Sequence, residues 1–262
     1  MSGARRSVLV SVVIPAFDEE RGIERAIAAV RDYLEPRVEA LEIVVVDDGS
    51  RDATAERVAA VAAADPRVRL IRSERNYGKG HAVRDGVLAS RGQVVAFMDV
   101  DLSTPVEMLD RVWPVLDAGA HVVVGSRRMA GATIEVHQSA VRELLGDVFR
   151  RTTRWLLGIP VSDLTCGFKA FTGPEGRALF RGLTLWDWSF DVEVLVAAVG
   201  AGLVVRDVPV TWRDDPDTKV RLSRDLPRVA SSLVRVLVRK ARRRYRRPLD
   251  LREETATGTT GG

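Results

Sequence analysis

Short apolar runs alternate with longer amphipathic stretches over the first half of the chain. Five runs rich in valine and isoleucine have the pattern of strands that are buried on both faces of a sheet. They are Val8 to Ile14, Leu41 to Val46, Val68 to Ile71, Val94 to Met98 and His121 to Val124. Strands that alternate with helices are typical of βα units, so we expect an α/β fold with a mainly parallel central sheet flanked by helices.

Four helices are predicted in the gaps between these runs. The first carries Ile23, Ile27 and Val30 on one side, which is the spacing of an amphipathic helix. The last begins with a proline, a residue suited to the first helical turn. The four predicted helices are Glu19 to Tyr33, Ala53 to Ala64, Gly80 to Ala89 and Pro105 to Leu116.

The pattern changes after Arg127. A polar, glycine-containing loop runs to Ser139, a helix is predicted over Val141 to Leu157, and the segment up to Val210 has a mixed pattern. We expect this half to shape the substrate side of one catalytic domain over residues 8–222.

A basic amphipathic helix is predicted over residues 223–247, followed by a disordered tail over residues 248–262. The tail is rich in Glu, Thr and Gly and has little to bury. Apolar and basic positions on the helix each recur at helical spacing, so they form two separate stripes. The apolar stripe comprises Leu226, Val229, Ala230, Leu233 and Leu237, and the basic stripe Arg228, Arg235, Arg239, Arg242 and Arg246.

The composition indicates a globular protein and the charge is uneven. Of 262 residues, 46% are hydrophobic and 29% charged, which excludes a disordered or fibrous chain. The formal net charge is +4, yet eight basic and no acidic residues fall between Arg235 and Arg247, so the rest is net negative. Such an asymmetry favours a local anionic partner, either a phospholipid surface or nucleic acid.

Several classes of protein are excluded by what the sequence lacks. The single cysteine, Cys166, can form neither an internal disulfide nor a zinc cluster. The longest apolar run, Val194 to Val205, is shorter than the ~20 residues of a membrane span. The N-terminal run lacks the small-residue cleavage site of a secretory signal, so we expect a cytoplasmic protein.

Two acidic pairs follow predicted strands. Asp47 and Asp48 end one strand, and Asp99 and Asp101 end another, so all four should meet at the carboxyl edge of the sheet. Carboxylates of this kind can hold Mg²⁺ or Mn²⁺ and leave positions for phosphate oxygens. Alternatively, Asp48 with Ser50, and the segment from Asp99, cap turns and helices.

An ordered set of motifs resembles the inverting family-two glycosyltransferases of GT-A fold. In the second half, three further motifs resemble dolichyl-phosphate glucosyltransferases and the related polyprenyl-phosphate mannose synthases. The first set is V-V-I-P-A-F-D-E-E (Val12 to Glu20), V-V-V-D-D-G-S (Val44 to Ser50), N-Y-G-K-G (Asn76 to Gly80), D-V-D (Asp99 to Asp101) and V-G-S-R (Val124 to Arg127). The second set is Asp163 to Phe171, Trp188 to Leu195 and Val208 to Trp212.

The resemblance implies a nucleotide-sugar site. Asp48 would accept a hydrogen bond from the base, and Asp99 and Asp101 would hold the metal and the donor diphosphate, with Ser103 where mannose synthases have glutamine. Lys79 opens a helix between two glycines, which suits a phosphate, although such loops also form plain turns. The remaining donor-site residues that it implies are Pro15, Phe17, Glu19 and Arg127.

The acceptor is expected to be a phosphate that basic residues position. The candidates are Arg127, Arg142 and Lys219, because guanidinium and ammonium groups bind phosphate oxygens. Alternatively, Arg142 is an ordinary charged residue on the surface of a helix. Asp191 falls where related transferases place an acid facing the acceptor, as a base or an orienting group, or it caps a helix over Val192 to Ala198.

The expected activity is metal-dependent, inverting transfer of a hexose to polyprenyl or dolichyl phosphate, giving a β-linked lipid sugar. The second-half motifs favour UDP-glucose as donor. The alternatives are a GDP-mannose-dependent polyprenyl-phosphate mannose synthase, a family-two transferase with a soluble or protein acceptor, and, remotely, a basic nucleic-acid-binding module.

A lipid acceptor and the basic helix favour a peripheral protein on the cytoplasmic, inner face of an anionic membrane, with no nucleic-acid partner. Trp186 and Trp188 either wall the sugar pocket or pack in the core.

Overall fold

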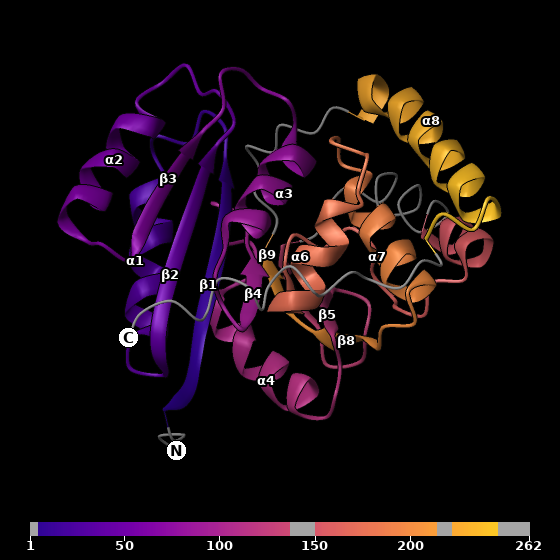
Figure 1. Ribbon diagram of the computed structural model, residues 1–262, viewed down its shortest axis with the longest axis horizontal. Helices are drawn as coiled ribbons and strands as arrows, with labels where there is room; N and C mark the ends of the chain where they lie inside the picture. The colour runs from indigo at the N-terminus through magenta and orange to yellow at the C-terminus, as the bar shows by residue number, and fades with distance from the viewer. Residues whose placement is uncertain (1–4, 137–149, 214–221, 246–262) are drawn as a thin grey trace, which may run out of the picture.

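The computed structural model describes residues 5–136, 150–213 and 222–245, whose core is a seven-stranded sheet (Figure 1). The strand order is β3-β2-β1-β4-β7-β5-β8. Neighbouring strands are parallel except β7, which is antiparallel to both β4 and β5. The predicted mainly parallel sheet is therefore confirmed. The strands are β1 (Arg6–Ala16), β2 (Val38–Asp47), β3 (Val68–Arg72), β4 (Val94–Phe97), β5 (Val122–Ser126), β7 (Lys169–Thr172) and β8 (Val205–Pro209).

The central strands are apolar on both faces because helices cover the sheet from both sides. Along β1, Val12 packs into one hydrophobic cluster and Val13 into the other, which is the alternation expected of a pleated strand. Along β2, Val45 and Val46 divide in the same way. This double burial explains why these strands read as continuous apolar runs in the sequence.

Each face of the sheet is covered by its own set of helices. One cluster contains the buried residues of α1 (Ile23–Leu34), α2 (Thr54–Ala64) and α4 (Leu109–Asp117). The other contains those of α3 (Lys79–Ala89), α6 (Gly173–Arg181) and α7 (Phe190–Gly200). A separate two-stranded sheet pairs β6 (Thr133–Val136) with β9 (Thr211–Arg213).

Two helices start later than predicted because of the local backbone conformation. Helix α1 begins at Ile23 rather than Glu19, because the Glu19 carbonyl accepts from the amides of Gly22 and Ile23 in a turn. Pro105 has extended backbone angles and precedes a 3-10 turn, Val106–Met108, so α4 starts later than predicted. In the segment of mixed pattern only the helix over Val192 to Ala198 was predicted, and it is observed as part of α7; strand β7 and helix α6 were not predicted.

The C-terminal helix α8 (Leu222–Ala241) packs on the body of the molecule, beside α7 (Figure 1). Val236 is fully buried, and Leu233 and Leu237 are partly buried against the same cluster. Leu233 and Leu237 of the predicted apolar stripe therefore contact protein, together with Val236, which was not assigned to the stripe. The helix ends at Ala241, before the predicted end at residue 247.

A buried carboxylate fastens the end of α8. The Glu193 side chain accepts hydrogen bonds from the Tyr245 hydroxyl at 2.8 Å and from the Leu185 amide at 2.7 Å. The Arg239 Nε lies 3.6 Å from the same carboxylate, so Arg239 belongs to an ion pair and not only to the predicted basic stripe.

Part of the remaining predictions falls outside the described residues. Of the predicted helix Val141 to Leu157, residues 150–157 are described and are helical. The predicted tail, residues 248–262, lies wholly outside. Of the helices in the described ranges, none combines the length and apolar character needed to span a bilayer.

Candidate active site

The ends of four parallel strands and the start of β7 meet at one edge of the sheet. Strands β1, β2, β4 and β5 finish there, and β7 begins there because it runs in the opposite direction. This geometry brings the acidic residues after β2 and β4 to the same edge as Arg127 after β5. The convergence expected from the sequence is thus present in the fold.

Lys79 and Asp99 form the centre of the site. Lys79 is the first residue of α3, and its Nζ lies 2.5 Å from Asp99 Oδ1. The Trp188 ring centroid lies 5.0 Å from the same ammonium. Burial would lower the pKa of Lys79, but the Asp99 and Asp191 carboxylates outweigh it and raise this pKa above its usual value. The lysine is therefore fully charged at neutral pH.

Asp101 lies on the exposed side of this pair. Its Oδ1 accepts a hydrogen bond from the Ser103 amide at 2.8 Å, so it also forms the local turn considered as an alternative. Desolvation and the negative charge of Asp99 raise the pKa of Asp101. Two neighbouring carboxylates that repel each other at an open edge form a site that a cation stabilises.

The other acidic pair contacts backbone. Asp48 accepts from the Tyr77 amide at 3.0 Å and from the Gly78 amide at 2.7 Å, which ties the end of β2 to the loop that carries Lys79. Burial raises the pKa of Asp48 against the effect of these bonds. Asp47 is fully buried and accepts from the Ser50 amide at 3.0 Å. Asp47 therefore forms a turn, and neither Asp48 nor Ser50 caps α2, whose N-cap is Ala53.

The remaining donor-site residues follow β1. Pro15 is buried in the strand beside Val46 of β2, and Phe17 and Glu19 are partly buried beyond its end. The Glu19 amide donates to Thr54 Oγ1 at 2.8 Å, which joins this segment to the start of α2. These residues border the carboxyl edge of the sheet, and their role at the donor stays a prediction.

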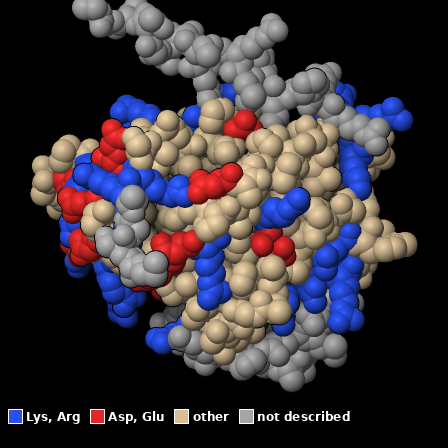
Figure 2. Space-filling view, turned by 90° about the horizontal axis from the view of Figure 1, so that it is seen from below, with Lys and Arg blue, Asp and Glu red and all other residues tan. Residues whose placement is uncertain are grey.

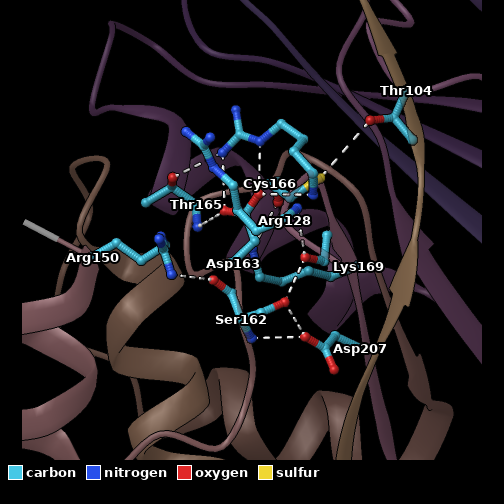
Figure 3. A network of polar contacts seen from close by, with 11 residues as sticks. Thr104, Arg128, Arg150, Ser162, Asp163, Thr165, Cys166, Lys169 and Asp207 are labelled. Carbon is cyan, nitrogen blue, oxygen red and sulfur yellow. Dashed lines mark hydrogen bonds and ion pairs between the residues drawn. The ribbon is translucent and has the colours of Figure 1, made fainter. Parts of the chain in front are cut away.

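Arg127 is partly buried and forms an ion pair with the buried Asp163, a residue to which the sequence analysis gave no role. Its Nε lies 2.7 Å from Asp163 Oδ2 and its Nη2 lies 3.0 Å from Oδ1, a two-pronged contact. Asp163 also accepts from the Thr165 amide at 3.2 Å (Figure 3). Asp163 thus takes two of the nitrogen atoms that would bind phosphate, and the phosphate role of Arg127 stays a prediction.

The same network reaches the neighbouring loop. Ser162 lies between Asp207 on β8 and the Arg150 guanidinium, which donates to the Ser162 carbonyl at 3.3 Å (Figure 3). The Ser162 amide donates to Asp207 at 2.7 Å. The loop that precedes β7 is therefore fixed from both sides.

Asp163→Asn is expected to lower the free energy of unfolding by about 3 kcal/mol at pH 7, because it leaves the Arg127 guanidinium without its counter-ion. Burial opposes ionisation, but Arg127 outweighs it and lowers the pKa of Asp163 to about 2, from 3.8. A lowered pKa adds stability above about pH 4 that is lost as the pH falls through 2, worth about 2 kcal/mol. Urea unfolding should therefore show the same difference between the two proteins at pH 7 and pH 5 and a smaller difference at pH 3. The exposed pair Arg31 and Asp32 supplies the control Asp32→Asn, for which little change is expected at any pH. A difference that stays constant down to pH 3 would contradict this assignment.

Asp191 lies at the start of α7 but is not its N-cap, which is Ser189. The Asp191 side chain is 2% exposed, and its Oδ1 lies 2.5 Å from the Nζ of Lys169. Burial raises the pKa of Asp191, and the positive charges of Lys169 and Lys79 oppose this shift. Lys169 was not singled out in the sequence, because a lysine at the start of a short apolar run has the pattern of a polar boundary.

Two tryptophans border the site. Trp186 is 45% and Trp188 42% exposed, so their packing in the core is excluded. The Trp186 carbonyl accepts from the Gly80 amide at 2.9 Å, and a Cβ at Gly78 would lie 2.5 Å from that oxygen. The glycines around Lys79 are therefore required for contact between the start of α3 and the tryptophan segment.

The donor set at Asp99 and Asp101 fits a hard divalent cation. Asp99 already binds one cation, the Lys79 ammonium, and a Cβ at Gly167 would lie 2.0 Å from Asp99 Oδ2, so glycine makes room for this carboxylate. Within residues 5–136, 150–213 and 222–245 no three carboxylate, imidazole or thiol groups converge to hold a metal ion. Such an ion would therefore take further oxygen ligands from phosphate and water, as Mg²⁺ and Mn²⁺ commonly do.

Two predicted acceptor residues, Arg142 and Lys219, lie outside the described residues.

The sequence analysis assigned no role to the histidines, and two of them make local contacts. His121 Nδ1 accepts from the Val204 amide at 3.1 Å, and the His81 ring stacks on Tyr77 with centroids 4.6 Å apart.

Comparison with known protein families identifies the class. Residues 11–172 match the family described as glycosyl transferase family 2. These residues run from the second half of β1 to the end of β7 and contain the whole acidic edge of the site. The chain belongs to this family and is a glycosyltransferase.

Comparison with individual proteins gives a more specific similarity within this family. The chain is 32% identical to dolichyl-phosphate beta-glucosyltransferase ALG5C of Trichomonas vaginalis over 242 residues, which cover 88% of this chain and 71% of that protein. It is 29% identical to the dolichyl-phosphate beta-glucosyltransferase of Saccharomyces cerevisiae over 246 residues, with 87% and 73% covered.

A solved structure confirms the GT-A fold. Glucosyl-3-phosphoglycerate synthase from Mycobacterium tuberculosis, in complex with Mn²⁺, UDP and phosphoglyceric acid, superposes with a TM-score of 0.63. The two chains are 24% identical, and the match covers 90% of this chain and 78% of that one.

Proposed function

We propose that this glycosyltransferase transfers glucose from UDP-glucose to a polyprenyl or dolichyl phosphate, with inversion to a β-linked lipid sugar. The observation that carries the proposal is the cluster of Lys79, Asp99 and Asp101 at the carboxyl edge of a family-2 fold. The similarity to dolichyl-phosphate beta-glucosyltransferases over most of the chain supports the sugar and the acceptor.

The donor diphosphate would lie beside the start of α3. Lys79 supplies a positive charge there, and the N-terminus of α3 favours an anion. Asp99 and Asp101 would hold Mg²⁺ or Mn²⁺, which neutralises the charge of a leaving diphosphate when bound. Complexes of the M. tuberculosis synthase with Mn²⁺ or Mg²⁺ and UDP support this choice of ligands. Pro15, Phe17, Glu19 and Asp48 would border the nucleotide.

The acceptor phosphate brings its own negative charge. A phosphate monoester is already ionised near pH 7, so its oxygen attacks without prior removal of a proton. The site must instead hold it with positive charge on the face of the sugar opposite the diphosphate. Arg127, Arg142 and Lys219 are the proposed contacts.

The reaction exchanges one glycosidic bond for another. A phosphate oxygen of the acceptor forms a bond to the anomeric carbon of glucose while the bond from that carbon to the UDP oxygen breaks. The electron pair of the broken bond leaves with UDP, and the configuration inverts. No proton is transferred in this step, so an acid such as Asp191 is needed to orient groups and not to remove a proton.

An extraction assay tests the proposal. The purified protein is incubated with Mn²⁺ or Mg²⁺ and with UDP-glucose or GDP-mannose, each with a short polyprenyl phosphate or with 3-phosphoglycerate. We expect metal-dependent sugar in the organic phase from UDP-glucose, with the β configuration by NMR. Organic-phase label from GDP-mannose alone would instead identify a mannose synthase. Transfer only to 3-phosphoglycerate, or metal-dependent donor binding without any lipid product, would exclude the lipid acceptor.

We also propose that the protein lies on the inner face of an anionic membrane. The charges at the end of the molecule that carries α8 in Figure 1 support this. Figure 2 shows Lys and Arg at that end with few acidic neighbours, whereas at the opposite end Lys and Arg are interleaved with acidic residues. Arg242 and Arg244 are both exposed there. Nearby, Trp155 is 82% exposed, as expected of an aromatic residue that contacts lipid head groups.

Arg242→Ala/Arg244→Ala is expected to weaken binding to anionic vesicles about 30-fold, since each basic residue near such a surface is worth about 1 kcal/mol. Flotation with vesicles that contain phosphatidylglycerol measures the change. The control Arg21→Ala/Arg25→Ala removes two exposed arginines, one just before α1 and one within it, and α1 lies at the opposite end of the molecule (Figure 1). This variant should leave flotation unchanged. Equal loss in both variants would argue against a defined membrane face, and preference for duplex DNA over vesicles would favour the nucleic-acid alternative.

A further inference from the structure

Strand β7 buries a lysine beneath the proposed donor site. Lys169 pairs with Phe97 of β4 on one side and with Val124 of β5 on the other, and its side chain is 0% exposed. The Nζ lies 2.8 Å from the Cys166 carbonyl oxygen and 2.5 Å from Asp191 Oδ1. The ammonium has therefore exchanged water for a carboxylate and a carbonyl that come from different elements.

Stability alone does not explain this pair. Removing a lysine and an aspartate from water is costly, and replacing such a pair by apolar residues of similar volume is often neutral or stabilising. A chain that needed only a filled core at this place would do as well with a methionine. The position of the pair next to the site suggests another use for its charge.

The pair continues an alternating row of charges that leads to the sheet edge. Lys169 contacts Asp191, and Lys79 contacts Asp99 at 2.5 Å. The two ion pairs are neighbours, because a Cβ at Gly80, the residue after Lys79, would lie 2.8 Å from the Cβ of Phe190, the residue before Asp191. In agreement with this contact, the Asp191 carboxylate raises the pKa of Lys79, and the Lys79 ammonium opposes the rise in the pKa of Asp191. The row runs from the interior to the residues proposed to bind the donor.

We propose that Lys169 is a positioning residue for sugar transfer: it fixes the Asp191 carboxylate, and Asp191 in turn holds the Lys79 ammonium toward the donor diphosphate. The inference rests on the proposed function of this site. It assigns Asp191 an orienting role, because a carboxylate that is 2% exposed and bound to Lys169 is not open to an acceptor. The charge that develops on the leaving diphosphate then meets a lysine that is already in place.

A double-mutant cycle on Lys169 and Asp191 tests the proposal. The variants are Lys169→Met, Asp191→Asn and the two together, each assayed for kcat, for KM of UDP-glucose, and for affinity toward UDP with Mn²⁺ by calorimetry. We expect Lys169→Met to lower kcat about 100-fold with KM changed less than threefold, since a misplaced group mainly affects the transition state. UDP carries the full charge of the leaving group, so its affinity should fall about tenfold.

The double variant separates positioning from stability. If Lys169 acts through Asp191, the double variant loses no more kcat than Asp191→Asn alone. Its free energy of unfolding should nevertheless recover relative to Lys169→Met, because no unpaired buried carboxylate remains. A purely structural pair would regain transfer together with stability. If Lys169→Met does not fold, Lys169→Gln, which keeps a hydrogen-bond donor, takes its place in the cycle.

Two results would overturn the proposal. One is a folded Lys169→Met that keeps kcat and UDP affinity within threefold of the unchanged protein. The other is a double variant whose kcat falls by the product of the two single losses. If the unchanged protein transfers sugar to no acceptor, the proposed function fails, whereas the UDP titrations still test Lys169 because they need no acceptor.

Discussion

Asp101→Ala is expected to lower kcat for sugar transfer about a thousandfold and to leave the fold intact. Electrostatic stabilisation by a bound cation is worth several kcal/mol in the transition state, and each 1.4 kcal/mol is a factor of ten. Asp101 is exposed and its carboxylate is repelled by Asp99, so its removal costs the fold little. Initial rates at saturating UDP-glucose and Mn²⁺ measure the loss, and circular dichroism and thermal melting test the fold.

Glu107→Ala is the matched control, because Glu107 is an exposed acid in the short 3-10 turn that follows the site. It should keep full activity. A folded Asp101→Ala protein with unchanged kcat would remove Asp101 from the metal site. Calorimetric titration with Mn²⁺ and UDP adds a second readout, in which Asp101→Ala should bind the ion weakly and Glu107→Ala normally.

Gly167→Ala is expected to lower kcat about 100-fold through a single added methyl group. The new Cβ would lie 2.0 Å from Asp99 Oδ2, a distance at which the carboxylate has to move. A carboxylate is the free end of a flexible side chain, so it can turn away at small cost to stability. The turn takes Asp99 out of line with Lys79 and with the proposed metal, and a displacement of about 1 Å at a reacting centre can cost 100-fold in rate.

Gly182→Ala supplies the control for this substitution, because a Cβ there would meet the Leu179 carbonyl oxygen at an ordinary 3.5 Å. Both variants should melt within a few degrees of the unchanged protein, and only Gly167→Ala should lose activity. If Gly167→Ala keeps its kcat, Asp99 does not need its observed orientation. A large loss of stability in Gly167→Ala would show that the methyl group displaces backbone instead.

The sheet and its acidic edge could be predicted from sequence because their signals are local. An apolar run followed by aspartate marks the end of a buried parallel strand, and parallel strands end at the same edge. Asp99, Asp101 and Lys79 therefore meet where the motifs indicated. The starts of α1 and α4 were less predictable, since single hydrogen bonds at Glu19 and the extended angles of Pro105 fix them.

The partners of the charged residues could not be predicted, because they depend on contacts between distant segments. Asp163 lies 36 residues from Arg127 and joins it only because β7 turns back between β4 and β5. The sequence shows three polar residues in D-L-T-C-G-F-K but not which of their side chains faces inward. Asp48 likewise bonds the amides of Tyr77 and Gly78, and this pairing follows from the crossing of two loops.

Strand β7 also sets the order in which the protein can fold. Strands β4 and β5 do not pair with each other, and β7, only Lys169–Thr172, lies between them. Until it inserts, both neighbours expose an open edge to other chains, and insertion requires closure of a loop of about 70 residues from the end of β4. Contacts between such distant segments form slowly. The halves that carry Asp99 and Arg127 therefore become one sheet late in folding, and the nascent chain depends on four residues to close its own aggregation-prone edges.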